Sequence, residues 1–331
     1  MRWIRVTLLL RLTIALSACA LAPGVHAAKL RVMGFSGTSN WPVFVGQAHG
    51  FFAKRGVDVE ITAARNSATQ LRALASGEID IALTAMDNVI AADASAPDAA
   101  IVAVAGVNQG GRSRLVVARD LTSMQELRGR ALAVDAVDTG YAFVLMSLLQ
   151  RGGVEPGSYT LVSAGSSRDR LAALQEGRVA GALLNAPTDA VAEAQGFRVL
   201  ASSAEVLSRY QGSVIAVRRA WAQQHAEELV AFLRGYIDAL EWLQDRSHRE
   251  AAIAVLIDRV PGITESEAAR SHAEMSDPST GALSPRAEID VEGVRAVLEL
   301  RAKFGPRADR LERDPYRYYD ASFYQRAIAH D

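Results

Sequence analysis

One segment of the sequence recurs one hundred residues later, and this repeat constrains the fold more than any other feature. The stretch SATQLRALASGEIDIAL begins at Ser67 and returns as SRDRLAALQEGRVAGAL from Ser167. Each copy indicates a serine N-cap, an amphipathic helix, a glycine that ends the helix in the left-handed conformation, and a buried strand. The positions that match in type are Ser67/Ser167, Leu71/Leu171, Ala73/Ala173, Leu74/Leu174, Gly77/Gly177, Ile79/Val179, Ala82/Ala182 and Leu83/Leu183. Two similar α/β lobes are predicted, with a chance likeness between two helix–glycine–strand units as the alternative.

Short runs rich in β-branched residues alternate with longer helical patterns, which is typical of parallel sheets built from crossover units. The predicted strands are 30–35, 57–62, 79–84, 100–107, 115–118, 131–134, 160–163, 179–184, 198–201 and 213–217. After the last of these the strand patterns stop. Helical patterns then cover 226–244, 249–260, 265–275 and 291–303. The predicted fold class is therefore α/β with a helical C-terminal part.

The first 27 residues have the composition of an export signal. Three arginines precede an apolar stretch at 12–22, which Pro23 and Gly24 end. This stretch is shorter than the roughly 20 residues that a membrane-spanning helix needs. Small residues at the end of the segment predict cleavage after Ala27. The sequence LSAC also resembles a bacterial lipobox, so a lipoprotein anchored through Cys19 is the alternative; both forms are exported.

Composition argues against several functions. The 36 basic and 37 acidic residues nearly balance, and no basic run is interleaved with aromatic residues, so a nucleic-acid partner is not expected. After cleavage at Ala27 the mature chain has no cysteine, which excludes disulfides, thiolate metal sites and cysteine nucleophiles from it. The catalytic motifs G-x-S-x-G and H-E-x-x-H and the P-loop are absent, and a carboxylate pair of Asp87 and Asp138 is the one catalytic arrangement left open. We therefore expect no enzyme activity, no cofactor and no metal.

Long ordered motifs run through the mature chain. NWPVFVGQAHGFFAKRGVDVEI begins at Asn40, and SATQLRALASGEIDIALTAMDNVI begins at Ser67. These segments resemble the periplasmic binding proteins related to the sulfonate, taurine and thiamine-pyrimidine importers. The resemblance continues through ELRGRALAV, VDTGYAFVLMSLLQRGGV, ALQEGRVAGALLNAP and YQGSVIAVRRAW. It covers nearly the whole mature chain.

The resemblance implies a two-lobed periplasmic-binding-protein fold of type II, in which each lobe is a mainly parallel sheet flanked by helices and a helical C-terminal wrap follows. Lobe 1 would comprise residues 28–113 plus 214–331, lobe 2 would comprise 114–213, and the hinge would lie near 112–116 and 210–214. The implied function is that of the substrate-binding component of an ABC importer. Such a protein is a periplasmic monomer that captures a small organic solute by hinge closure and delivers it to an inner-membrane permease.

Three other functions remain open at this stage. A periplasmic sensor would report the bound solute to a membrane partner. An enzyme of thiamine-precursor metabolism shares the fold in eukaryotes, but this chain lacks that enzyme's cysteine cluster. The effector domain of a transcriptional regulator needs a helix-turn-helix, and none is evident in the sequence.

Ligands of open parallel α/β sheets bind beyond the carboxyl ends of the strands, and this rule selects the candidate ligand-binding residues. Trp41 is suited to stack on a flat ligand and Asn40 to hydrogen-bond to it, with packing and helix capping as the alternatives. Asp87 at a helix start is also explained by the helix dipole alone. In lobe 1 the candidates are Ser36, Asn40, Trp41, Met86, Asp87 and Asn108.

In lobe 2 the amides at a helix start offer a place for a polar or anionic group. Asn185 is the preferred contact, because a purely structural strand end does not require an amide side chain. The lobe 2 candidates are Asp138, Thr139, Gly140, Tyr141, Asn185 and Thr188. Asp135 and Asp138 would repel a strong anion unless an arginine at 112, 114 or 168 offsets them. The expected ligand is therefore a heteroaromatic such as a pyrimidine, then a carboxylate, then a sulfonate.

Overall fold

The computed structural model of the protein describes residues 27–35, 37–95, 97–110, 113–185, 188–277, 280 and 282–329. Some predictions fall outside these residues. They concern the export signal up to residue 26, including Cys19, the candidate ligand residue Ser36, and Arg112 of the predicted hinge.

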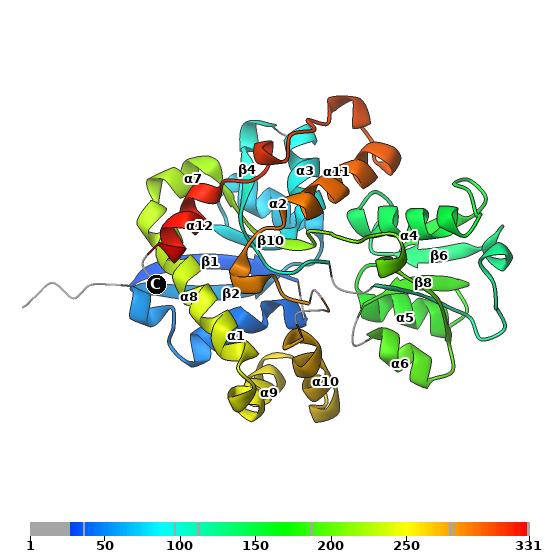
Figure 1. Cartoon of the computed structure of the whole chain (residues 1–331), viewed down its shortest axis with the longest axis horizontal. Helices are drawn as coiled ribbons and strands as arrows, with labels where there is room; N and C mark the ends of the chain where they lie inside the picture. The colour runs from blue at the N-terminus through cyan, green and yellow to red at the C-terminus, as the bar shows by residue number, and fades with distance from the viewer. Residues whose placement is uncertain are drawn as a thin grey trace, which may run out of the picture.

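The first of two sheets combines strands from both sides of a long insertion (Figure 1). Its strands are β1 (Ala28–Gly34), β2 (Val57–Ala63), β3 (Ile81–Ala85), β4 (Ile101–Gly106) and β10 (Ser213–Arg218), in the order β2-β1-β3-β10-β4. β1 pairs in parallel with β2 and β3, whereas β10 is antiparallel to β3 and β4. All six residues of β4 are buried, as expected for a strand covered on both faces.

The second sheet has the same strand order as the first. Its strands are β5 (Arg114–Val117), β6 (Ala131–Val134), β7 (Thr160–Ser163), β8 (Gly181–Leu184) and β9 (Arg198–Ser202), in the order β7-β6-β8-β5-β9. Leu132 lies opposite Gly181, just as Val32 lies opposite Ile81 one hundred residues earlier. β5 is antiparallel to both neighbours, as β10 is in the first sheet. The sequence repeat therefore corresponds to two sheets of equal topology, and the predicted two-lobed α/β fold is confirmed.

The repeated helices begin one residue earlier than predicted. The predicted caps Ser67 and Ser167 are the first helical residues of α2 (Ser67–Ser76) and α5 (Ser167–Gln175). The capping side chains are those of Asn66 and Ser166, which accept from backbone N–H groups three residues later. The predicted left-handed glycines are correct, with φ of 81° at Gly77 and 70° at Gly177.

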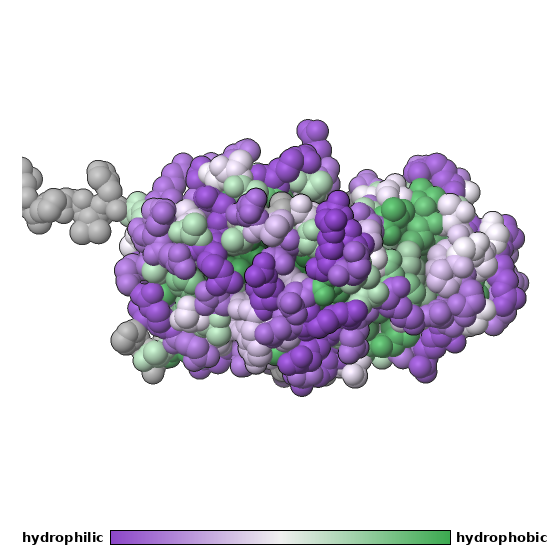
Figure 2. Space-filling view, turned by 90° about the horizontal axis from the view of Figure 1, so that it is seen from above, coloured by the Kyte–Doolittle hydropathy of each residue, from purple (hydrophilic) through white to green (hydrophobic). Residues whose placement is uncertain are grey.

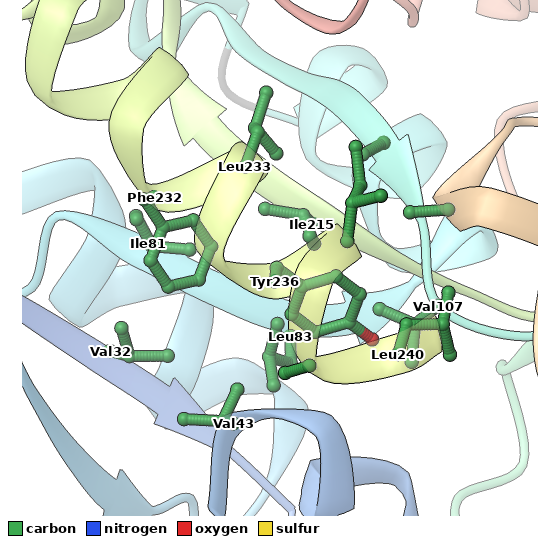
Figure 3. Close-up of a cluster of buried hydrophobic side chains, with 14 of the residues drawn as sticks. Val32, Val43, Ile81, Leu83, Val107, Ile215, Phe232, Leu233, Tyr236 and Leu240 are labelled. Carbon is green, nitrogen blue, oxygen red and sulfur yellow. The ribbon is translucent and has the colours of Figure 1, made fainter. Parts of the chain in front are cut away.

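A long helix covers the first sheet and forms much of its core (Figure 3). Apolar residues recur every three or four positions in α8 (Ala226–Gln244), so one face of this helix is hydrophobic. Its Phe232 stacks on Phe52 with ring centroids 5.2 Å apart, and Tyr236 packs near Leu83 and Val107. No helix in the described part of the chain is long and apolar enough to cross a membrane.

The remaining helices surround the two sheets. Near the first sheet lie α1 (Trp41–Ala48), α3 (Met86–Ser95), α7 (Arg219–Gln224), α9 (Arg249–Arg259), α10 (Glu265–Met275), α11 (Val291–Phe304) and α12 (Ala321–Ile328). Near the second sheet lie α4 (Gly140–Arg151) and α6 (Thr188–Ala194), together with α5.

One C-terminal helix touches both sheets' cores. α11 packs Val294 and Val297 into an apolar cluster of the first lobe and Leu300 into an apolar cluster of the second. Figure 1 shows α11 lying next to α4. On the face seen in Figure 2, hydrophobic side chains gather over the second lobe, whereas the first lobe is largely hydrophilic there. The C-terminal part thus contacts lobe 2 as well as wrapping lobe 1.

Candidate functional site

A pocket of about 90 Å³ lies between the two sheets. Both lobes contribute to it, and so do the segment before α1, the connection after β4 and helix α10 with the residues that follow it. The lining residues are Thr38, Ser39, Asn108, Gly110, Tyr141, Asn185, Ser271, Glu274, Met275 and Ala282. Loops at strand ends therefore meet here, as the sheet rule predicts.

Several polar groups of this lining have no hydrogen-bond partner within the described residues. They are the hydroxyls of Thr38, Ser39 and Ser271 and the Nδ2 amide group of Asn108. Thr38, Ser39 and Asn108 are partly exposed, whereas Ser271 is buried. A set of unpaired groups that faces one pocket is therefore available to water or to a bound solute.

The two asparagines are fixed through their side-chain oxygens. Oδ1 of Asn108 accepts from the backbone N–H of Gly110 at 3.1 Å and of Ser213 at 3.0 Å. Oδ1 of Asn185 accepts from the Ser113 hydroxyl at 2.9 Å. Residues of the connection before β5 thus hold both amides, and Ser213, the first residue of β10, also holds that of Asn108. What the pocket receives from Asn108 is an N–H donor.

Tyr141 forms the second-lobe wall beside Asn185. Burial raises the pKa of its hydroxyl, and a hydrogen bond with Asn185 partly offsets this rise. Behind it, Asp135 accepts from the Thr139 hydroxyl at 2.7 Å. Burial raises the pKa of Asp135, and this hydrogen bond together with the positive charge of Arg170 acts in the opposite direction. This wall therefore presents a neutral phenol, with the charges of Asp135 and Arg170 acting on each other and on Tyr141.

Thr139 has a structural role. Its side chain caps α4 by accepting from the Ala142 N–H at 3.4 Å, and its hydroxyl donates to Asp135. Both of these hydrogen bonds engage the Thr139 hydroxyl within the protein. Arg170 is buried and donates from Nε to the Leu183 carbonyl at 2.8 Å.

Asp87 and Arg301, both of lobe 1, form a buried ion pair that contacts the start of α4 in lobe 2. Arg301 donates from Nε to Oδ1 of Asp87 at 2.6 Å and from Nη2 to Oδ2 at 2.7 Å. Oδ2 also accepts from the backbone N–H of Gly140 at 2.8 Å. Arg301 reaches the Asp138 carbonyl at 3.2 Å, and its guanidinium lies 5.2 Å from the ring centre of Phe143. Sequence reasoning missed Arg301 because it is 214 residues from Asp87.

Asp87 and three more predicted ligand residues of lobe 1 are not in the pocket lining. Trp41 has no exposed surface; its Nε1 donates to the Ala252 carbonyl at 3.0 Å and its ring meets the edge of His272. Met86 is equally buried. Asn40 uses Nδ2 on the Phe35 carbonyl at 2.7 Å. The structure corrects the stacking role of Trp41 and the contact role of Met86, because core packing leaves neither side chain accessible.

The other predicted residues divide between the pocket and its surroundings. Asn108, Tyr141 and Asn185 line the pocket. Gly140 is buried against Asp87, and Asp138 is exposed. Thr188 is buried at the start of α6 and donates its backbone N–H to the Asn185 carbonyl at 2.9 Å. The ligand roles of all these residues stay predictions.

Helix α10 supplies the part of the lining that the sequence did not indicate. A capping box of Thr264 and Glu267 starts this helix. His272 and Met275 anchor it in the core, and burial lowers the pKa of His272. Ser271 and Glu274 then face the pocket. No strand ends at α10, so the sheet rule had no means to select it.

No group of three or more histidine, cysteine, aspartate or glutamate side chains among the described residues is arranged to hold a metal ion.

The family model described as NMT1/THI5 like matches residues 38–249. The chain belongs to the NMT1/THI5-like family. The resemblance inferred from the sequence motifs is thereby confirmed. A comparison with curated proteins finds no match.

Solved structures share the fold of this NMT1/THI5-like chain. The ligand binding component of an ABC-type import system from Staphylococcus aureus, with zinc bound, has a TM-score of 0.73 and 17% identity, over 91% of this chain and 99% of that one. The alkanesulfonate-binding protein SsuA from Xanthomonas axonopodis pv. citri, bound to MOPS, gives 0.72 and 17%, over 89% and 99%. The periplasmic nitrate-binding protein NrtA from Synechocystis PCC 6803 gives 0.76 and 14%, over 92% and 89%.

Proposed function

We propose that the protein is the substrate-binding component of an ABC-type importer, exported to the periplasm, which captures a small organic solute and delivers it to a membrane permease. The observation that carries this proposal is the pocket whose lining comes from both lobes and includes four polar groups without partners among the described residues: the hydroxyls of Thr38, Ser39 and Ser271 and the Nδ2 group of Asn108. Membership of the NMT1/THI5-like family supports it. The printed descriptions of the similar structures, an import component, a sulfonate binder and a nitrate binder, point the same way.

Binding would act on the two connections between the lobes. A solute that touches Ser39 and Ser271 on one side and Tyr141 and Asn185 on the other favours the closed state by its contacts with both lobes. The proposed lobes are residues 28–113 plus 214–331 and residues 114–213, with the protein acting as a monomer. No covalent step is needed, because retention and release follow from closure alone.

The solute expected for this pocket is small and polar. Asn108 offers an N–H donor, and Glu274 of α10 adds a carboxylate to the same lining. The hydroxyl groups of the lining both donate and accept hydrogen bonds. A flat heterocycle that carries both a carbonyl or ring nitrogen and an amino group fits this arrangement, and a carboxylate or a sulfonate remains the alternative.

Thermal-shift screening of the chain from Ala28 onward tests the proposal, with pyrimidines, amino acids, aromatic carboxylates and sulfonates as probes. A ligand at about 100 times its dissociation constant adds roughly 2.7 kcal/mol to the free energy of unfolding. A hit that mass spectrometry recovers unchanged supports a binding protein. Recovery as a product would replace the proposal with an enzyme, and the absence of any hit would count against solute capture from these classes.

A matched pair of variants then tests the site. Asn185→Ala removes a lining amide and is expected to weaken binding of the hit by about tenfold or more. Asn88→Ala is the control, because Asn88 donates to Ser67 and Thr84 away from the pocket lining. We expect the control to lower the melting temperature without changing the dissociation constant. Equal affinities of both variants and the wild type would contradict this site.

A further inference from the structure

The start of α4 already holds an anion that belongs to the protein. Gly140 is the first residue of this helix, and its N–H has no intrahelical acceptor. The Asp87 carboxylate accepts from it at 2.8 Å and is 1% exposed. A Cβ atom at position 140 would come within 2.9 Å of Cβ of Asp87 and 2.7 Å of the Tyr210 hydroxyl. The missing side chain thus permits the close approach of a carboxylate from the other lobe.

Arg301 neutralises this carboxylate. Its two hydrogen bonds to Asp87 form a bidentate pair, and Arg301 is only 5% exposed. Without the Asp87 carboxylate, the positive end of α4 and the guanidinium of Arg301 would together attract an anionic group. Because Asp87 occupies the start of α4, neither attraction is available to a solute.

Three other described arginines, Arg114, Arg168 and Arg170, also have carboxylate neighbours. Arg114 contacts Asp189 at 3.2 Å and Glu193 at 3.1 Å. The charges of Arg170 and Asp135 act on each other, as do those of Arg168 and Glu267. The described pocket lining itself contains Glu274 and no lysine or arginine. The lining that the structure describes therefore offers no cation to an anionic ligand.

We propose that Asp87 is a specificity-determining residue, which supplies the anion at the start of α4 in place of the ligand. The pocket then selects an uncharged or positively charged solute over sulfonates, nitrate and other strong oxyanions. This rests on the proposed function as a binding protein and narrows its ligand class. Two of the similar structures are described as sulfonate- and nitrate-binding proteins, so the proposal separates this chain from them by ligand charge.

The first arm of the test uses the wild-type chain with ethanesulfonate, its neutral isostere ethanesulfonamide, and nitrate. Sodium chloride at equal ionic strength is the reference. We expect no saturable rise in melting temperature from either anion. A saturable rise with ethanesulfonate or nitrate overturns the proposal, while leaving the binding function itself intact.

The second arm of the test uses Asp87→Ala, which removes the carboxylate from the start of α4. This variant is expected to bind nitrate or ethanesulfonate at least about tenfold more tightly than the wild type, because the N–H of Gly140 and the guanidinium of Arg301 become free. The added anion should shift the Gly140 amide resonance, and ethanesulfonamide should not. The double variant Asp87→Ala/Arg301→Gln should lose the gained affinity.

A folded Asp87→Ala variant that responds to none of these anions overturns the proposal. If the variant does not fold, Asp87→Asn, which keeps the side-chain shape and removes the charge, is measured in the same way. Should that variant also fail to fold, the wild-type arm decides. A solute that is converted to product refutes the binding function and leaves the gain of anion binding in Asp87→Ala as a separate result.

Discussion

The two lobes share one scaffold but differ in the charge that they bury. At equivalent positions, Gln70 donates from Nε2 to the Leu83 carbonyl at 3.0 Å and Arg170 donates from Nε to the Leu183 carbonyl at 2.8 Å. Phe35 of lobe 1 corresponds, one hundred residues on, to Asp135 of lobe 2. The same backbone contact is therefore made by a neutral amide in one lobe and, in the other, by an arginine whose charge acts on Asp135. The repeat thus keeps the geometry of this backbone contact, whereas the charge of the arginine lies in lobe 2, the lobe whose pocket wall carries Tyr141.

Replacing Gln70 of lobe 1 by arginine, the residue at the equivalent position of lobe 2, should have the largest effect on stability. Gln70→Arg places a cation where the side chain is fully buried and where lobe 1 has Phe35 in place of a carboxylate. We expect a loss of roughly 3–5 kcal/mol in the free energy of unfolding, because the charge is buried without compensation. Urea denaturation measures this loss, with Gln70→Met as a neutral control. A loss no larger than that of the control would mean that both lobes tolerate a buried charge equally.

The reverse exchange should be milder. Arg170→Gln keeps a donor for the Leu183 carbonyl but removes the donor to the Gly165 carbonyl and the positive charge beside Asp135. A loss of about 2–3 kcal/mol is expected, because hydrogen bonds from charged groups contribute more than neutral ones. Denaturation curves of this variant and of Gln70→Arg, recorded together, compare the lobes directly. A stabilised Arg170→Gln variant would contradict the stabilising role of the Arg170 guanidinium.

The pH dependence of stability should also distinguish the lobes. Burial raises the pKa of Asp135 in the folded chain above its usual value. The folded state then holds the proton more tightly than the unfolded state, so this contribution is present below the unfolded pKa of about 3.9 and is lost as the pH rises through the folded pKa. The free energy of unfolding of the wild type should therefore fall relative to Asp135→Asn as the pH rises from about 4. Parallel pH profiles of the two proteins would rule this out.

The smallest effect concerns the serines that begin the repeated helices. The hydroxyl of Ser167 accepts from the backbone N–H of Asn185 at 3.1 Å, whereas that of Ser67 accepts from the side chain of Asn88. Each change to alanine should cost about 1 kcal/mol of stability. Only Ser167→Ala should also weaken ligand binding, because it loosens a pocket-lining residue. Calorimetric titration of both variants checks this, and an equal loss of affinity in both would remove the distinction.

The fold was largely predictable, because the repeat carries the pattern of caps, helices and buried strands in each lobe. The serine caps were wrong by one residue, since Asn66 is as good a cap as serine and the sequence does not choose between adjacent candidates. The site was predictable where polar residues follow a strand, as at Asn108 and Asn185. The stacking role predicted for Trp41 was wrong because an aromatic residue at a helix start is suited either to a ligand or to the core. Here its ring packs against His272 in the core.

The rest of the site depends on tertiary contacts that leave no local pattern. Ser271 and Glu274 reach the pocket because the core holds α10 beside it. The pairing of Arg301 with Asp87 joins residues 214 positions apart. Neither a strand end nor a helix cap marks these residues, so sequence periodicity could not have selected them.

The strand β10, which returns from the second lobe to pair with β3 and β4, also imposes an order on folding. The strands of the second sheet come from one uninterrupted stretch of chain, 114–202, so its pairing is complete long before the C-terminus is made. The first sheet must wait for β10, and its core must wait for α8 as well. Long-range pairing of this kind is slow and leaves apolar surface open in the meantime. We therefore expect the unfinished N-terminal half to be the part of the nascent chain that most needs a chaperone.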